Sequence, residues 1–344
     1  MVLNNPYLLL KLNRLLKNHS LKCLGVLVAD RLGMRHLSIR MDPFLGCNLR
    51  CQMCHFSSPE YLARKSEIMS LDEYARVAEL MFPKALQVIL GCGAEPTVHP
   101  KLPALVEMAK RTYRVPFVGI ATNAQLLTRD LAANLLDAGL DEITVSVHGV
   151  RQETYERLQP PATFEKLHRA FASLTELAEQ GRYKFAVRVN FTVNPDNHRE
   201  LPEFFQVFGQ YKIDILQVRK IFDLGDTVYH DRDLDPYLGH LEATRRTLQE
   251  QCEARKTTLL CPGFRAEPEG SNTLSTILLP LVHRSVWPGM VWKEDFDWKN
   301  ETYEAYCKRT KWHRNLLRMA RTKASVLQKE ILNGHRSLGY DVSG

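Results

Sequence analysis

The sequence predicts an α/β fold: a partial (β/α)6 TIM-like barrel, preceded by an amphipathic helix and followed by an α-rich extension. From residue 37 onward, short strand-like runs alternate with helix-like segments, six such units occur, and the alternation stops after residue 222. Parallel strands need crossover connections, so this alternation indicates a parallel sheet with helices outside it. Six units are fewer than the eight of a closed barrel, so we expect a partial barrel or an open sheet.

The N-terminal segment, residues 1–36, is expected to be helical over 6–18. Its leucines have helical spacing between basic residues: Leu8, Leu9, Leu12, Leu15 and Leu16 against Lys11, Arg14 and Lys17. Such a helix packs on the main domain or, because it is basic, lies on an anionic membrane surface. The charges interrupt the apolar run, so no secretory signal or bilayer span is predicted. We therefore expect a cytoplasmic protein, with peripheral membrane contact as an alternative.

Residues 37–222 contain the barrel units. The expected strands are LSIRM (37–41), LQVILG (86–91), FVGIAT (117–122), EITVSVH (142–148), FAVRVNFTV (185–193) and ILQVRKI (215–221). The expected helices lie near 71–82, 101–112, 128–138, 151–158, 163–180 and 198–209. Each strand combines β-branched residues with a short length, and each helical segment is amphipathic.

Residues 223–344 form the predicted C-terminal extension, a cap on the substrate side of the barrel. An Asp-rich stretch (223–236) precedes a helix-like segment (237–255). Prolines and glycines between 256 and 300 favour turns and short strands, and 301–335 has the pattern of a basic helix or helix pair.

Composition restricts the class of protein. The chain has 344 residues, 44% of them apolar and 25% charged, with a formal net charge of +7. These values are typical of a globular protein, and the modest positive charge more often serves solubility than nucleic-acid binding, which we do not expect. Three of the eight cysteines fall within eight positions. That distribution is unlike a disulfide framework and favours reduced thiols with a metal.

The segment FLGCNLRCQMCHF follows the first expected strand and carries the strongest chemical signal. Cys47, Cys51 and Cys54 have C-x3-C-x2-C spacing, which places three soft thiolates on one loop. Such a set suits an iron–sulfur cube and leaves one iron without a protein ligand. Structural zinc is the alternative, but it normally requires four ligands. His55 directly follows Cys54 and could be a fourth ligand only in a strained chelate.

This spacing after the first barrel strand resembles the radical S-adenosylmethionine (radical SAM) superfamily, in its branch for molybdenum-cofactor biosynthesis and peptide maturation. The resemblance implies a 4Fe–4S cluster whose open iron binds the amino and carboxylate groups of SAM. It also implies oxygen sensitivity and a flavodoxin- or ferredoxin-type reductant. In that chemistry one electron cleaves SAM to a 5'-deoxyadenosyl radical. Met53 stands where the superfamily usually has an aromatic residue beside the adenine, and it offers a similar apolar contact.

Two further segments resemble superfamily patterns at the next strand ends. In LGCGAEPTVHP, residues Gly93, Ala94 and Glu95 correspond to the segment often written GGEP, with Ala94 in place of glycine. The resemblance implies that this loop approaches the SAM ammonium. In ATNAQLL, Asn123 corresponds to the asparagine of a TNG segment, with Ala124 in place of glycine.

The fourth and fifth strands carry the remaining candidates for SAM binding. Ser146 in VSVHG resembles the S-x-D or S-x-H pattern, and Arg188 or Asn190 in RVNFTVNPDN could bind the carboxylate or ribose of SAM. Each alone has an ordinary structural explanation, such as a satisfied strand polar group or an arginine paired with a nearby acid. Their joint order favours a site, because active sites of such folds lie at the carboxyl ends of strands.

The other cysteines have weaker claims. Cys252, Cys261 and Cys307 could hold one auxiliary cluster, but they lack the dense pairs of a full cysteine-rich extension, and three unrelated buried thiols are the simpler interpretation. The catalytic residues are unknown from sequence. Cys92 could donate a hydrogen atom to a substrate radical, or it could be a small core residue.

The sequence thus predicts a radical SAM enzyme that removes a hydrogen atom from an unreactive carbon of its substrate. We expect a small-molecule or a lipid- or sugar-linked substrate, given the basic amphipathic termini. A peptide substrate is the alternative within the superfamily. A cluster-bearing scaffold without activity is a more distant one.

Overall fold

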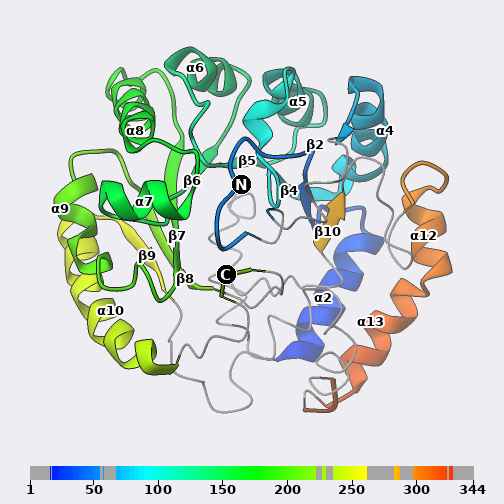
Figure 1. Ribbon diagram of the computed structural model, residues 1–344. Coiled ribbons are helices and arrows are strands. Elements are labelled where there is room, and N and C mark those ends of the chain that lie inside the picture. The colour runs from blue at the N-terminus through cyan, green and yellow to red at the C-terminus, as the bar shows by residue number, and fades with distance from the viewer. Residues whose placement is uncertain are drawn as a thin grey trace.

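The computed structural model describes residues 16, 18–54, 57, 67–221, 227–229, 235–261, 283–286, 297–323 and 325–327. Its centre is an eight-stranded sheet with the order β10-β1-β4-β5-β6-β7-β8-β9, in which every neighbouring pair is parallel. The sheet curves, and helices α4 to α10 cover its outer face (Figure 1). Since no pairing closes β9 onto β10 among the described residues, the predicted partial barrel is confirmed.

The strands of the main sheet are β1 (Leu37–Met41), β4 (Ala85–Leu90), β5 (Phe117–Thr122), β6 (Glu142–Ser146), β7 (Ala186–Val193), β8 (Ile215–Lys220), β9 (Thr258–Leu260) and β10 (His283–Val286). The helices are α2 (His19–Arg31), α4 (Leu71–Met81), α5 (Leu102–Glu107, continued by a π turn to Thr112), α6 (Arg129–Asp137), α7 (Gln152–Leu158), α8 (Phe164–Glu179), α9 (Phe204–Phe208), α10 (Asp235–Arg255), α12 (Tyr303–Arg309) and α13 (Trp312–Arg321). A short antiparallel pair, β2 (Phe44–Leu45) and β3 (Glu67–Ile68), stands apart from the sheet.

All six predicted strands are present, and two more extend the sheet at its edges. β9 pairs with β8 and β10 pairs with β1. Both come from the region that the sequence assigns to the C-terminal extension. With three and four residues, they are too short to show a periodic pattern.

Side chains alternate between the two faces of the sheet. On β7, Val187, Val189 and Phe191 are fully buried against the outer helices, whereas Arg188 and Asn190 point to the inner face and keep partial exposure. Alternation of this kind is the two-residue period of a strand. The apolar core therefore lies between sheet and helices, and the inner face is polar and retains exposure to solvent.

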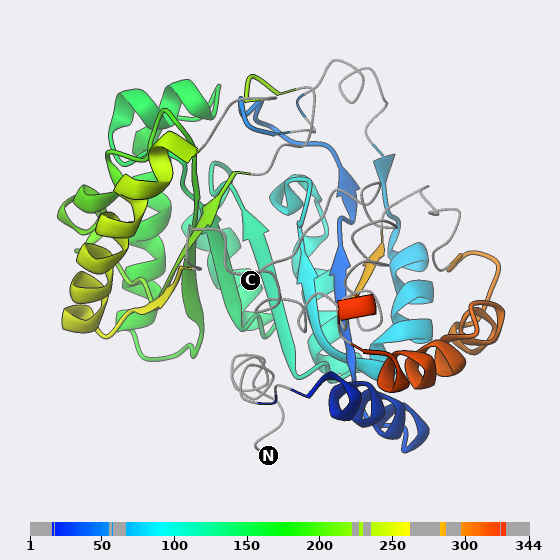
Figure 2. The ribbon, with the colours of Figure 1, turned by 90° about the horizontal axis from the view of Figure 1, so that it is seen from below.

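Two helices that are far apart in the sequence pack side by side. α2 lies against α13, on the side of the sheet where the strands begin (Figures 1 and 2). Asp30 at the end of α2 accepts hydrogen bonds from Lys84 Nζ and His313 Nε2, both at 2.7 Å. This position leaves the opposite ends of the strands, marked by the arrowheads in Figure 2, available for a site.

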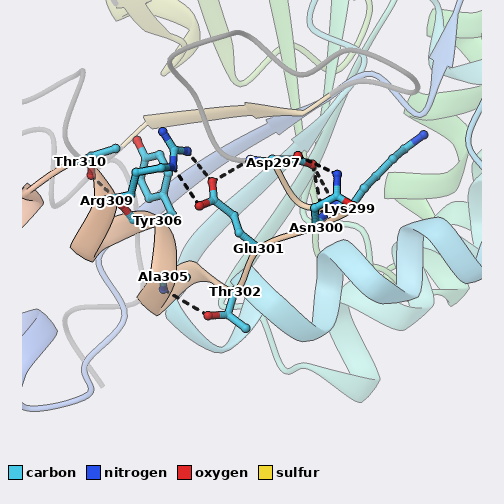
Figure 3. A network of polar contacts seen from close by, with 9 residues as sticks. All are labelled: Asp297, Lys299, Asn300, Glu301, Thr302, Ala305, Tyr306, Arg309 and Thr310. Atoms are coloured by element: carbon cyan, nitrogen blue, oxygen red, sulfur yellow. Dashed lines mark hydrogen bonds and ion pairs between the residues drawn. The ribbon is translucent and has the colours of Figure 1, made fainter.

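The segment before α12 is held by its own polar network (Figure 3). Glu301 accepts hydrogen bonds from Asp297 N at 3.1 Å and from Arg309 Nε at 3.0 Å, and the bonds from Arg309 lower the pKa of this carboxyl. Thr302 caps α12 by accepting a hydrogen bond from Ala305 N. The predicted basic helix pair is thus confirmed as α12 and α13 over 303–321.

Other predictions fall where less is described. The N-terminal helix predicted over 6–18 lies outside the described residues, except for positions 16 and 18. The helix that is described there, α2, begins at His19 after the Asn18 cap and was not predicted. Among the described helices, none is long and apolar enough to cross a bilayer.

Candidate SAM and cluster site

The loop after β1 holds the three clustered cysteines. Its backbone is fixed to the segment after α7, because Arg50 N donates to Pro160 O at 2.6 Å and Gln52 N donates to Leu158 O at 3.0 Å. Glu95 N donates to Gly46 O at 3.0 Å and fixes the start of the loop. The loop after β1 therefore contacts both the loop after β4 and the end of α7.

Cys47, Cys51 and Cys54 lie close enough together to affect one another's ionisation. Burial, together with smaller contributions from Glu95 and Cys54, raises the pKa of the Cys47 thiol to about 11. Burial likewise raises the pKa of Cys51, and the neighbouring Cys54 and Cys47 raise it further. Leu49 N donates to Cys47 Sγ at 3.4 Å. Because burial raises the pKa of these thiols, they become thiolates at neutral pH only when a bound metal supplies positive charge.

A single metal ion and an iron–sulfur cube require different arrangements of these cysteines. Among the described residues, no three His, Cys, Asp or Glu side chains converge on one point as ligands of a single metal ion do. A structural zinc needs such convergence from four ligands, so the zinc alternative gains no support there. A cube differs in that each thiolate binds a different iron, and its ligands therefore surround a volume. N–H donors directed at a sulfur, as at Cys47, also suit a thiolate ligand.

Asp42 organises the loop after β4. It follows β1 directly, and its Oδ1 accepts hydrogen bonds from three successive backbone N–H groups: Cys92 at 2.7 Å, Gly93 at 3.0 Å and Ala94 at 3.1 Å. The loop is tight, because Gly91 has φ +81° and a Cβ there would lie 2.4 Å from Pro96. Since these N–H groups face Asp42, the Gly93 and Ala94 segment is held in one conformation.

Glu95 is 2% exposed and links the ends of β4 and β5. Its Oε1 accepts hydrogen bonds from Thr97 N at 3.0 Å and Thr122 Oγ1 at 2.6 Å, and its Oε2 accepts one from Asn123 N at 2.7 Å. Burial raises the pKa of this carboxyl, and these hydrogen bonds oppose that effect. The carboxylate is thus directed at protein donors, and in this geometry it positions the loop.

Asn123 connects β5 to the cluster loop. Its Nδ2 donates to Asn48 Oδ1 at 2.8 Å and lies 3.6 Å from Cys47 Sγ. The left-handed conformation of Ala124, φ +61°, occupies the place where the pattern has glycine. The structure therefore places the predicted site residue Asn123 within hydrogen-bonding distance of a cluster cysteine.

Ser146, Asn190 and Arg188 share the inner face of β6 and β7. Ser146 pairs with Asn190 in register at the carboxyl end of β6. Arg188 lies one inward position lower and forms an ion pair with Glu142, with Nε and Oε1 3.1 Å apart. The ordinary explanation for Arg188, pairing with an acid, thus applies in this structure, while Ser146 and Asn190 face the same space as the cluster loop.

The comparisons with known proteins agree with this geometry. Residues 41–178 match the family model described as the Radical SAM superfamily. Over this segment the chain is similar to the radical SAM superfamily. The superfamily uses a 4Fe–4S cluster and SAM, and these are accordingly the cofactors of this chain.

Similar radical SAM proteins include molybdenum cofactor biosynthesis protein 1 of Drosophila melanogaster, 25% identical over 72% of this chain and 40% of that protein. The GTP 3',8-cyclase of Chlorobaculum tepidum is 27% identical over 55% of each chain. This chain therefore spans about half the length of these relatives. Among solved structures, anSMEcpe with bound AdoMet has a TM-score of 0.58 at 15% identity, covering 83% of this chain and 84% of that one. Streptococcus suis SuiB bound to SAM has a TM-score of 0.56 at 15% identity, covering 74% and 58%. These two share the fold.

Met53 is buried, at 8% exposure, and packs with Leu158, Ile221 and Tyr229. In the radical SAM pattern this position lies beside the adenine. Here it also anchors the cluster loop on the segment after α7. The apolar contact predicted for Met53 is consistent with this location.

The cysteines outside the radical SAM motif do not form one group. Cys252 on α10 and Cys261 after β9 affect each other electrostatically, but Cys307 is on α12 at the opposite side of the molecule (Figure 1). Cys307 instead lines a small cavity with Asp30 and Lys84. An auxiliary cluster held by all three is therefore wrong for this structure, because α10 and α12 pack on opposite edges of the sheet.

Cys92 follows β4 and is exposed. The surrounding protein nonetheless raises the pKa of its thiol to about 12, against the effect of Arg40 and Arg219. It therefore keeps its S–H proton at neutral pH, as a hydrogen-atom donor must. Asp42, Arg40 and Arg219 were not predicted as site residues. For Arg40 and Arg219 a signal was present, because both are polar residues within predicted strands.

Proposed function

We propose that this protein is a radical SAM enzyme whose cluster is held by Cys47, Cys51 and Cys54. The observation that supports this most is that the loop carrying the three cysteines contacts the loops after β4 and β5 at the carboxyl end of the sheet. The match to the superfamily model over the same segment supports it independently.

The bound cofactors would supply one electron from the cluster to SAM, which breaks the bond between sulfur and C5' and yields methionine and an adenosyl radical that takes hydrogen from the substrate. The chain's own residues would position these groups. Asp42 and Glu95 hold the loop after β4 rigid, Asn123 donates toward a cluster thiolate, and Ser146 and Asn190 offer polar atoms on the SAM side. Met53 would supply an apolar contact for the adenine.

A direct test is anaerobic reconstitution with iron and sulfide, followed by addition of SAM and dithionite. We expect 5'-deoxyadenosine and methionine in equal amounts, detected by liquid chromatography. Cys252→Ser, which replaces a buried cysteine outside the cluster loop, is the matched control and should produce 5'-deoxyadenosine like the wild type. An intact cluster with no 5'-deoxyadenosine under any reductant would favour a scaffold and refute the proposal.

For the substrate we propose a small molecule, with a lipid- or sugar-linked compound in the same class. The polar inner face of the sheet supports this, since it offers hydrogen-bonding side chains within the barrel. A peptide substrate is the alternative, because one similar structure is SuiB bound to the precursor peptide SuiA, whereas a similar enzyme by sequence is named a GTP 3',8-cyclase. Hydrogen transfer from deuterated candidates into 5'-deoxyadenosine separates the two classes.

The reductant and the compartment complete the proposal. We propose a flavodoxin- or ferredoxin-type electron donor and a cytoplasmic location. Support comes from the cysteines, all eight of which are thiols rather than disulfides. Reduced thiols are typical of a reducing compartment. Reduction of the cluster by a purified flavodoxin, followed by its visible absorbance, tests the first point.

A further inference from the structure

Three arginines, from β1, β7 and β8, share the inner face of the barrel. Arg219 on β8 lies opposite Thr192 of β7, two positions beyond the pair Asn190 and Gln217. Residues paired across parallel strands point to the same face, so Arg219 points inward with Asn190. Arg188 lies on the same face one step lower on β7.

Arg40 reaches this face from the other side of the sheet. It pairs with Ile89 of β4, which pairs with Gly119 of β5, which in turn pairs with Glu142 of β6. Because Glu142 contacts Arg188 on the inner face, Arg40 also points inward.

The three guanidinium groups are close to one another. Gln217 Oε1 accepts hydrogen bonds from both Arg188 Nη1 and Arg219 Nη2, each at 3.1 Å. Burial, together with the positive charges of Arg40 and Arg188, lowers the pKa of Arg219 to about 10. Like charges in contact are costly unless an anion offsets them.

Little negative charge within the described residues offsets this group. Glu142 pairs with Arg188, and Asp42 already accepts three backbone N–H groups. Among the described residues, no ion pair joins a carboxylate to Arg40 or Arg219.

Polar atoms without partners point into the same space. The Nε atoms of Arg40 and Arg219 and the Oδ1 atom of Asn190 are buried and lack hydrogen-bond partners in the described structure. Buried polar groups are normally satisfied, so such atoms indicate a missing ligand. The two arginine Nε donors are positively charged and have no carboxylate partner in the described structure, so an oxyanion would satisfy both their charge and their hydrogen bonds. Asn190 Oδ1 is an acceptor, so a hydroxyl or amine of the same ligand would satisfy it.

We propose that Arg40, Arg188 and Arg219 bind an oxyanion of the substrate, a phosphate or a carboxylate, inside the barrel. This inference rests on the proposed function only in assigning the anion to the substrate. The Cys92 thiol lies beside Arg40 and Arg219, so a substrate anchored there lies next to a candidate hydrogen donor. The anion selects for acidic small molecules and fixes the carbon that reacts.

Calorimetric titration tests the site without turnover. Inorganic pyrophosphate and citrate are titrated separately into the reconstituted full chain at fixed ionic strength, once without SAM and once with SAM in excess. Pyrophosphate represents phosphates and citrate represents carboxylates. We expect one of them to bind with a stoichiometry of one, and its identity decides which kind of oxyanion the site takes.

Substitutions then assign the binding to the arginines. Arg219→Gln and Arg40→Gln should each weaken binding about 10- to 100-fold, as expected for loss of one charge-assisted contact. Arg219→Lys, which retains the charge, should weaken it less. The control, Arg169→Gln, removes an arginine that is 66% exposed and paired only with Glu165, and it should leave binding unchanged.

The outcomes separate the two proposals. The inference is overturned if neither anion binds, or if Arg40→Gln and Arg219→Gln leave the binding unchanged. It is also overturned if SAM abolishes the binding, because the arginines would then hold the SAM carboxylate. Retained SAM affinity of the variants shows that they fold. If anions bind as expected but SAM is never cleaved, the proposed function fails and the anion site stands.

Discussion

Replacement of Glu95 by glutamine tests how the loops around the cluster are held. Glu95 is 2% exposed, and each of its two oxygens receives a backbone N–H: Oε1 from Thr97 at 3.0 Å and Oε2 from Asn123 at 2.7 Å. The hydroxyl of Thr122 adds a further donor at 2.6 Å. A glutamine side chain fits the same space but has one oxygen and one NH2 group.

The size of the effect follows from this geometry. Whichever way the amide is turned, its NH2 faces one backbone N–H, so one buried donor loses its acceptor. An unsatisfied buried group costs about 1–3 kcal/mol, and hydrogen bonds to a charged acceptor are stronger than those to a neutral one. We therefore expect Glu95→Gln to lower the free energy of unfolding by about 2–4 kcal/mol.

Urea unfolding of the reduced apo-protein measures this change. Glu165→Gln is the matched control: Glu165 has a side chain 77% exposed and lies 3.5 Å from Arg169 one turn away. An exposed pair of this kind contributes at most about 0.5 kcal/mol. A loss for Glu95→Gln no larger than that of the control would refute the role assigned to the buried carboxylate.

Three further predictions concern the same region. Asn123→Ala removes the hydrogen-bond donor near Cys47 Sγ. The reduction potential of the cluster should then become more negative by about 20–60 mV in a redox titration, the equivalent of one hydrogen bond of ~0.5–1.5 kcal/mol. An unchanged potential contradicts this. Burial lowers the pKa of His148 to about 4, below its unfolded value of about 6.5. The unfolded state therefore binds the proton first, and stability should fall as pH drops from about 6.5 toward 4, by at most ~3 kcal/mol, with a smaller slope in His148→Gln. Gly91→Ala should lower the free energy of unfolding by about 2 kcal/mol or more, because the new Cβ would lie 2.5 Å from a backbone oxygen. The control Gly25→Ala, in an open helical position, should not destabilise the protein. Equal melting temperatures of the two variants would contradict this prediction.

The central strands were predictable because each is a short run rich in β-branched or apolar residues and is followed by an amphipathic helical segment. β7 also shows a two-residue alternation: its outward Val187 and Phe191 are fully buried, and its inward Arg188 is not. β9 and β10 could not be predicted, because three or four residues are too few to show a pattern. In addition, β10 pairs with β1, which lies more than 200 residues earlier in the sequence. α2 was missed for a related reason, since it is stabilised by packing on α13.

The candidate site was predictable where chemistry fixes residue spacing. Three closely spaced cysteines on one loop indicate an iron–sulfur cluster, because their thiolates must all reach the same cube. The contribution of Asp42 was not predictable, because an aspartate after a strand could serve many purposes until the loop after β4 is seen to donate three N–H groups to it. Similarly, the grouping of Arg40, Arg188 and Arg219 depends on strand order and register.

The iron content of the protein tests the central claim most directly. Anaerobically reconstituted wild-type chain should hold about four iron atoms and four sulfides, the content of one cube. The variant with Cys47, Cys51 and Cys54 replaced by alanine should hold none, while Cys252→Ala retains the wild-type content. Wild-type protein without iron, or a triple variant that binds as much iron as the wild type, would contradict the account.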